Sequence, residues 1–105
     1  MLTEDELLLE YRYQRSSLEE QGDELYRGEQ SVNNMIEQTS SEISRMLEEL
    51  GGDPSEASQF ARYRLNQVSQ EMNESFEFEK RQIQNKIEDT EVTFNQQLRQ
   101  LHEEG

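Results

Sequence analysis

The stretch Leu50-Gly51-Gly52-Asp53-Pro54-Ser55 lies at the midpoint of a chain of 105 residues and decides how the chain folds. Its two consecutive glycines suit the end of a helix, where one residue adopts a left-handed conformation. Asp53 suits the N-cap of a second helix, and Pro54, the only proline, suits the first position of that helix. The stretch therefore predicts a tight turn, at about residues 50–54, between two helices.

The sequence on each side of this turn indicates a long helix. Interior glycines occur only at Gly22 and Gly28, each at a cost of about 1 kcal/mol relative to alanine. After the turn, apolar residues recur every eleven residues, a period close to that of a straight helix. These rows are Ala61, Met72, Ile83 and Phe94, then Leu65, Phe76, Ile87 and Leu98, then the half-polar row Val68, Glu79, Thr90 and Leu101. Before the turn, a seven-residue stride with one four-residue step places Tyr11, Leu18, Leu25, Val32, Ile36, Ile43 and Leu50 on one stripe.

The paired stripes predict an all-α fold, in which residues 1–105 form a single domain. Two long antiparallel helices, over about residues 3–49 and 54–102, would form an elongated helical hairpin. A turn near Gly52 would place Tyr11 opposite Phe94. It would also place apolar residues opposite one another along the rest of the two stripes.

The same register predicts where the hairpin packs best. Ile36 falls opposite Val68, at the level where apolar residues meet most regularly. Gly28 falls opposite Phe76, and Gly22 falls opposite Ile83, so both glycines would leave room for large side chains.

The charge of the chain excludes several classes of function. Asp and Glu number 24 against 10 Lys and Arg, for a formal net charge of -14. This excess disfavours binding to nucleic acid or to anionic membranes, because phosphate affinity comes from clustered Lys and Arg. The apolar run Leu7-Leu8-Leu9 is far shorter than the ~20 residues of a membrane span. We expect a cytoplasmic protein without a signal peptide, exported, if at all, by another route.

The residue types also argue against catalysis. The chain has no cysteine and one histidine, His102, which we expect to lie in solvent. A disulfide framework, a Cys/His metal site and a Cys nucleophile are therefore impossible. The sequence predicts no catalytic residue, no metal site and no cofactor, and hence no enzyme.

Several large apolar residues lie off the two stripes. Leu9 and Tyr13 are four residues apart and would form one continuous patch on the first helix. Met35 and Met46 would form a second seam, eleven residues apart. The remaining members of this group are Tyr26, Phe60, Tyr63 and Phe78. We expect these seams to bind further helices.

The beginning of the first helix is the predicted partner-binding region. Its inward layers include polar or small residues, such as Gln14 with Arg15 and Gln21 with Gly22, so we expect the hairpin to pack least well there. It nevertheless keeps aromatic residues of the kind enriched in binding hot spots. The predicted binding residues are Leu8, Leu9, Tyr11, Tyr13, Leu18, Leu25, Phe78 and Phe94.

The sequence from Tyr11-Arg12-Tyr13-Gln14-Arg15 through Leu25-Tyr26-Arg27-Gly28-Glu29-Gln30 resembles a known family. This family comprises the small acidic helical proteins encoded beside LXG-domain toxins in Gram-positive bacteria. The hairpin is also distantly similar to the WXG-type proteins of type VII secretion. It departs from them at the turn, where Leu50-Gly51-Gly52 replaces Trp-x-Gly, and it lacks their Tyr-x-x-x-Asp/Glu export motif.

The resemblance implies a non-enzymatic adaptor, or targeting chaperone, for a toxin. Such a protein would bind the helical N-terminal domain of the toxin, alongside a second small helical protein, and ready the toxin for export by a type VII route. Two alternatives stay open: a self-associating coiled coil, which forms a homodimeric four-helix bundle when alone, and a chaperone subunit of another secretion system.

Overall fold

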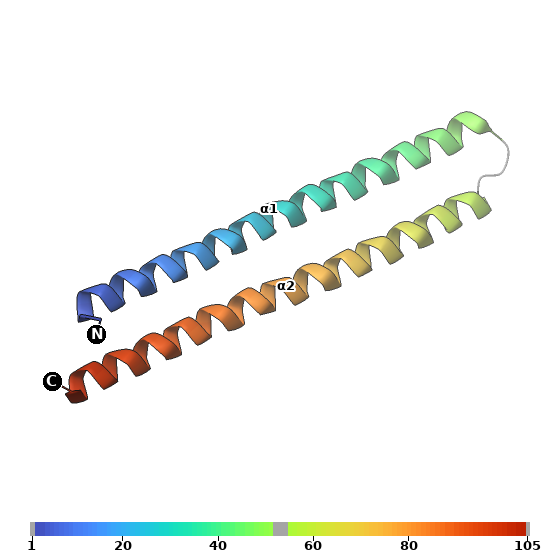
Figure 1. The fold of residues 1–105 in the computed structure, drawn as a ribbon. Coiled ribbons are helices and arrows are strands. Elements are labelled where there is room, and N and C mark those ends of the chain that lie inside the picture. Colours follow the sequence, from blue (N-terminus) through green and yellow to red (C-terminus); the bar gives the residue numbers. More distant parts are fainter. Residues whose placement is uncertain (1, 52–54, 105) are drawn as a thin grey trace. The chain divides into compact units, whose positions relative to one another are not determined.

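The described residues form two long helices (Figure 1). The computed structural model describes residues 2–51 and 55–104. Helix α1 spans Glu4–Leu50 and helix α2 spans Ser55–Glu104, and the described residues contain no strand. The predicted all-α fold, with two helices joined near the midpoint of the chain, is confirmed. The helix ends lie within two residues of the predicted ones.

Thr3 caps the start of α1. The backbone N–H of Glu6 donates to Thr3 Oγ1 at 3.2 Å, and the N–H of Leu7 donates to the carbonyl oxygen of Thr3 at 2.9 Å. The Thr3 hydroxyl thus satisfies a backbone donor that a helix start leaves free, and Thr3 and Glu6 have the spacing of a capping box. The acidic first turn, Glu4 to Glu6, adds favourable charge at the positive end of the helix dipole.

A left-handed glycine ends α1, as the sequence predicted. Gly51 has φ of 71°, and its N–H donates to the carbonyl oxygen of Glu48 at 3.3 Å. Leu50, the last helical residue, is exposed rather than part of the apolar stripe, because it lies at the helix end. The remaining predicted turn residues, Gly52, Asp53 and Pro54, lie outside the described residues, so their capping roles stay a prediction.

The chain divides into two compact units, and each pairs a segment of α1 with a segment of α2. The terminal unit comprises Met1–Leu25 and Phe78–Gly105. The turn unit comprises Tyr26–Glu77. In the terminal unit the start of α1 lies beside the end of α2 (Figure 1), and Glu4 Oε2 lies 3.4 Å from His102 Nε2. The two segments are therefore antiparallel there.

Packing in the terminal unit follows the predicted stripes, with one difference. Leu7 is the one buried hydrophobic side chain among the described residues, at 5% exposure. The predicted register puts Leu8 near Leu98 instead, and Leu8 is half-buried. Leu7 lies four residues before Tyr11 and hence on the same helix face, which explains its burial. The other inward side chains of this unit are half-buried: Tyr11, Leu18, Leu25, Ile83, Ile87, Phe94, Leu98 and Leu101.

The turn unit packs less completely than predicted. Ile36 is half-buried, but Val68, its expected partner, is 38% exposed. The prediction that this level of the hairpin packs best is therefore wrong. Met72, four residues further along α2 in a fully apolar row, is also 38% exposed, so α2 is loosely covered over this stretch. The half-buried apolar side chains here are Val32, Ile36, Ile43, Leu47, Ala61, Leu65 and Phe76.

The two interior glycines differ. A Cβ atom on Gly28 would lie 4.0 Å from Cε1 of Phe76, so this glycine does face a large side chain of the other helix. A Cβ atom on Gly22 would meet nothing within 4 Å, which contradicts its predicted packing against Ile83. The room-making role holds for Gly28 alone.

Candidate partner-binding surfaces

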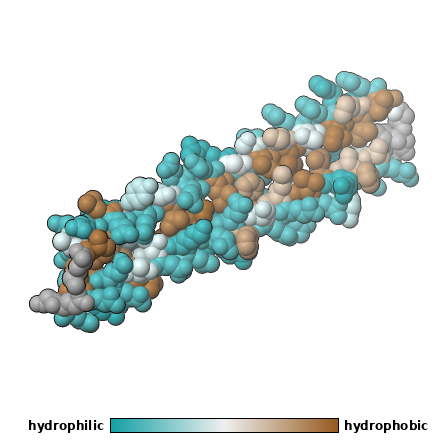
Figure 2. Space-filling view, in the orientation of Figure 1, coloured by the Kyte–Doolittle hydropathy of each residue, from teal (hydrophilic) through white to brown (hydrophobic). Residues whose placement is uncertain are grey.

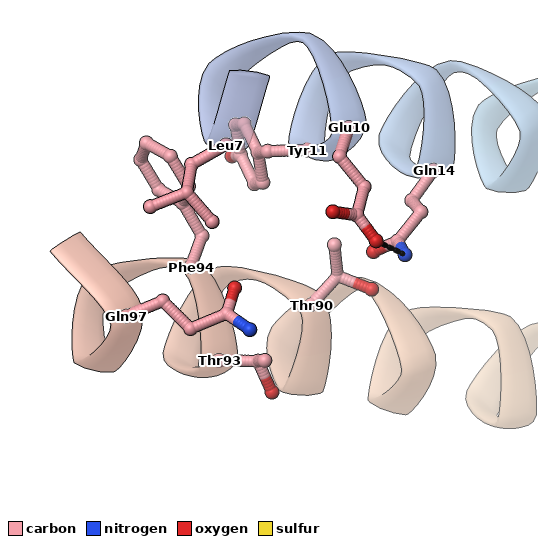
Figure 3. Close-up of a pocket in the computed structure, with 8 residues that line it drawn as sticks. All are labelled: Leu7, Glu10, Tyr11, Gln14, Thr90, Thr93, Phe94 and Gln97. Carbon is pink, nitrogen blue, oxygen red and sulfur yellow. Dashed lines mark hydrogen bonds between the residues drawn. The ribbon is translucent and has the colours of Figure 1, made fainter. Parts of the chain in front are cut away.

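A stacked aromatic pair joins the two helices of the terminal unit. The rings of Tyr11 and Phe94 have centroids 4.5 Å apart and planes inclined by 21°. This is the pairing that the register predicted. Leu7, one helical turn before Tyr11, covers the same end of the interface (Figure 3). These three large side chains form the best-packed part of the protein.

Arg15 forms a polar cluster beside the stacked pair. Its Nη1 donates to Glu91 Oε1 at 2.6 Å and to the Tyr11 hydroxyl at 2.7 Å, and its Nε donates to Glu19 Oε1 at 3.0 Å. The hydrogen bond with Tyr11, followed by that with Glu19, raises the pKa of the Arg15 guanidinium above its usual range. Arg15 thereby links α1 to α2 through Glu91.

The sequence pattern predicted Arg15 only as part of a polar layer that weakens the interface. The structure shows that this layer makes an ion pair across the interface instead. A signal was present in the sequence, because Arg15 lies four residues from both Tyr11 and Glu19, the spacing at which helical neighbours meet. The premise that the hairpin packs least well at its terminal end is wrong.

A small cavity lies between the helices of the terminal unit (Figure 3). Its volume of about 50 Å³ is enough for a few water molecules and too small for an organic ligand. Its lining combines apolar and polar side chains: Leu7, Glu10, Tyr11, Gln14, Thr90, Thr93, Phe94 and Gln97. Gln14 Nε2 donates to Glu10 Oε1 at 3.5 Å within it. This cavity is a feature of helix packing rather than a binding site.

A wider, open groove runs along one side of the same unit. It has a volume of about 460 Å³ and is lined by Tyr13, Gln14, Ser17, Leu18, Lys86, Asp89 and Thr90. Tyr13 is 77% exposed at its edge, and Leu9, one turn earlier, is 67% exposed. We call Leu9 and Tyr13 the outer patch. The groove and the outer patch together form a surface along which another helix can lie.

The eight predicted binding residues all belong to the terminal unit, where the structure separates them into two groups. Three are exposed: Leu9, Tyr13 and Phe78. Five are half-buried: Leu8, Tyr11, Leu18, Leu25 and Phe94. Tyr11 and Phe94 already contact each other, so they support the surface from within rather than present themselves to a partner. Leu18 lines the groove next to Tyr13.

The turn unit carries its own exposed apolar side chains, as expected from their positions off the stripes (Figure 2). They include Tyr26, Met35, Met46, Phe60 and Tyr63. Exposed hydrophobic residues in both units, on a chain of only two helices, favour protein partners.

No family model, curated protein or solved structure matches the chain. The family resemblance of its first helix therefore stays a prediction. Neither helix contains, within the described residues, a segment long and apolar enough to cross a membrane. Over the same residues, no three His, Asp or Glu side chains cluster in a way that could hold a metal ion.

Proposed function

We propose that the protein is a non-enzymatic adaptor that binds a helical domain of another protein through the outer patch and the adjoining groove. The observation that carries this proposal is the exposure of Leu9 and Tyr13 beside an open groove between two helices. A helix with an apolar stripe recognises such a surface by placing its apolar side chains in the groove. Tyr13, with its large apolar ring and polar tip, suits the centre of such an interface.

The charge of the surface specifies the kind of helix. Glu6, Glu10 and Glu20 flank the outer patch on α1, and all three are exposed. A partner helix with Lys or Arg beside its apolar stripe would match these carboxylates, which would raise the association rate and set the orientation. The apolar contacts would supply most of the affinity.

The family resemblance supplies the finer proposal. The partner would be the helical N-terminal domain of a toxin of the LXG class, bound together with a second small helical protein, and the complex would leave the cell by a type VII route. Two observations support this step. One is the sequence of the first helix, and the other is a two-helix fold that leaves apolar residues exposed.

Co-expression with the helical domains encoded by neighbouring genes tests the proposal. The parent protein should co-purify with one of them, and Leu9→Glu with Tyr13→Glu should abolish co-purification. Both side chains are exposed, so the circular dichroism of the variant should match that of the parent. Met35→Glu with Met46→Glu is the matched control, because it places the same two charges on an exposed seam of the turn unit.

Two outcomes would overturn the assignment of the surface. If the outer-patch variant binds with unaltered affinity, the interface lies elsewhere. If only the Met35 and Met46 variant loses binding, that seam is the interface. A parent protein that forms a stable dimer and binds none of the candidate domains would favour the alternative, a self-associating coiled coil.

A further inference from the structure

The backbone and the packing of α1 would accept alanine at both of its interior glycines. Neither Gly22 nor Gly28 has a positive φ, so neither holds a conformation that a side chain disfavours. A Cβ atom on Gly22 would meet nothing within 4 Å, and one on Gly28 would lie at an ordinary van der Waals distance, 4.0 Å, from Phe76. The space beside Phe76 is thus wide enough for the methyl group of alanine.

Both glycines weaken α1, and they do so in one place. At an interior position, alanine favours the helical state about fivefold over glycine, because glycine loses more backbone freedom on folding. The two glycines lie six residues apart, and α2 contains none over Ser55–Glu104. Each helical N–H donates to the carbonyl oxygen four residues earlier, so the hydrogen bonds of the amides of residues 22–32 all depend on this segment.

The segment between the glycines is also where α1 passes from one compact unit to the other. The terminal unit ends on α1 at Leu25, and the turn unit begins at Tyr26. This boundary lies midway between Gly22 and Gly28. A glycine contributes no side chain to the packing of either unit, so little burial is lost if the helix opens here.

We propose that residues 22–28 of α1 form a hinge, at which the helix opens while both units stay folded. Opening breaks the hydrogen bonds of about two or three helical turns and exposes little apolar surface. The other connection between the units is α2, which has no glycine and stays a continuous helix. Long helices of this kind curve gently, so α2 can follow the motion without breaking.

The hinge has a consequence for binding that goes beyond the proposed adaptor role. Leu9 and Tyr13 are exposed on the terminal unit, and Phe60 and Tyr63 are exposed on the turn unit. When the hinge is open, each unit can meet a partner surface by itself. The inference concerns the chain alone and needs no partner for its test. Its failure would leave the adaptor proposal standing, and failure of the adaptor proposal would leave the hinge measurable.

Amide hydrogen exchange of the full-length protein tests the hinge. After correction for intrinsic rates, the amides of residues 22–32 should be protected at least about tenfold less than those of residues 11–18 and 36–43. Gly22→Ala with Gly28→Ala should raise their protection about 25-fold, since each alanine contributes about fivefold. Low concentrations of urea should leave the exchange of residues 22–32 nearly unchanged, because a local opening exposes little surface.

Ser41→Ala with Ser44→Ala is the matched control, because it places two alanines at exposed positions of α1 within the turn unit. It should stabilise the protein against global unfolding. It should leave the protection of residues 22–32 unchanged, since the local opening does not include either serine. Both variants should keep the circular dichroism of the parent.

Three results would overturn the inference. In the parent, residues 22–32 would be protected as strongly as the segments on either side. In the glycine variant, their protection would be the same as in the parent. In the serine variant, their protection would rise, which would show that these amides exchange through unfolding of the whole protein.

Discussion

The terminal unit and the turn unit are built from the same two helices, yet they are held together differently. The terminal unit has a buried leucine, a stacked aromatic pair and an ion pair across the helices. The turn unit has half-buried side chains and a glycine facing Phe76. In the turn unit the two helices are close in sequence, since α1 ends at Leu50 and α2 begins at Ser55. Bringing them together therefore costs little chain entropy. The terminal unit has no such connection nearby, and side chains must supply the attraction.

The largest expected effect concerns Leu7. Leu7→Ala should destabilise the protein by about 2–4 kcal/mol, as other buried leucine truncations do. Leu9→Ala removes the same atoms two residues away from an exposed position and should change stability by less than about 0.5 kcal/mol. Urea unfolding followed by circular dichroism measures both.

Ile36→Ala extends this test to the turn unit. We expect a smaller loss than for Leu7, about 1–2 kcal/mol, because Ile36 is only half-buried and leaves a site open to solvent. The same unfolding experiment applies. A loss that equals or exceeds that of Leu7→Ala would show that the turn unit, and not the terminal unit, dominates stability.

The next effect concerns the connection. Gly51→Ala should cost about 1–2 kcal/mol, because a side chain disfavours the left-handed conformation at φ of 71°. Gly22→Ala should instead stabilise the protein by about 1 kcal/mol, since it improves helix propensity and meets no neighbour within 4 Å. Thermal unfolding of the two variants should shift in opposite directions. If the two substitutions shifted the thermal midpoint equally, the backbone conformation at residue 51 would not require a glycine.

A double-mutant cycle measures how strongly the stacked rings of Tyr11 and Phe94 interact. Tyr11→Leu and Phe94→Leu, made singly and together, should give a coupling energy of about 0.5–1.5 kcal/mol. Additive losses would show that the two rings contribute through burial alone. The pair Tyr13 and Phe78, both exposed, should show no coupling and serves as the control.

The smallest effect concerns the ion pair. Glu91→Gln keeps an acceptor for Arg15 but removes its charge, and both side chains remain about two-fifths exposed. We expect a slight decrease in the thermal midpoint and a weaker dependence of that midpoint on salt concentration. A midpoint that depends on salt as strongly as in the parent would assign no electrostatic role to this contact.

The sequence predicted the features of the fold that depend on periodicity and backbone chemistry. The two helices and the contact of Tyr11 with Phe94 follow from spacing, and a left-handed glycine at the end of α1 follows from the pair Gly51-Gly52. The position of a residue on an apolar stripe did not reveal how deeply its side chain is buried. Three leucines in succession, residues 7–9, leave open which one faces inward, and only the rotation of α1 about its axis decides.

The exposed surfaces were predicted better than the core. All the apolar residues assigned to positions off the stripes, including Leu9, Tyr13, Phe60 and Tyr63, are exposed. Polar contacts were missed, because a sequence pattern does not show which side chains meet. The contact between Arg15 and Glu91 joins residues 76 apart in sequence. Gln67 makes hydrogen bonds with both Tyr63 and Arg64.

The contact between Tyr11 and Glu91 joins residues 80 apart and determines the order in which a newly made chain can fold. Synthesis completes α1 before α2 begins, and the turn unit has all its residues once Glu77 has been added. The terminal unit must wait for Glu91 and Phe94, which are made after every residue of the turn unit. Domains fold as units during synthesis, the N-terminal ones first, so the turn unit can form before the terminal unit. The apolar side chains at the start of α1 are made before the turn unit but can be covered only after it.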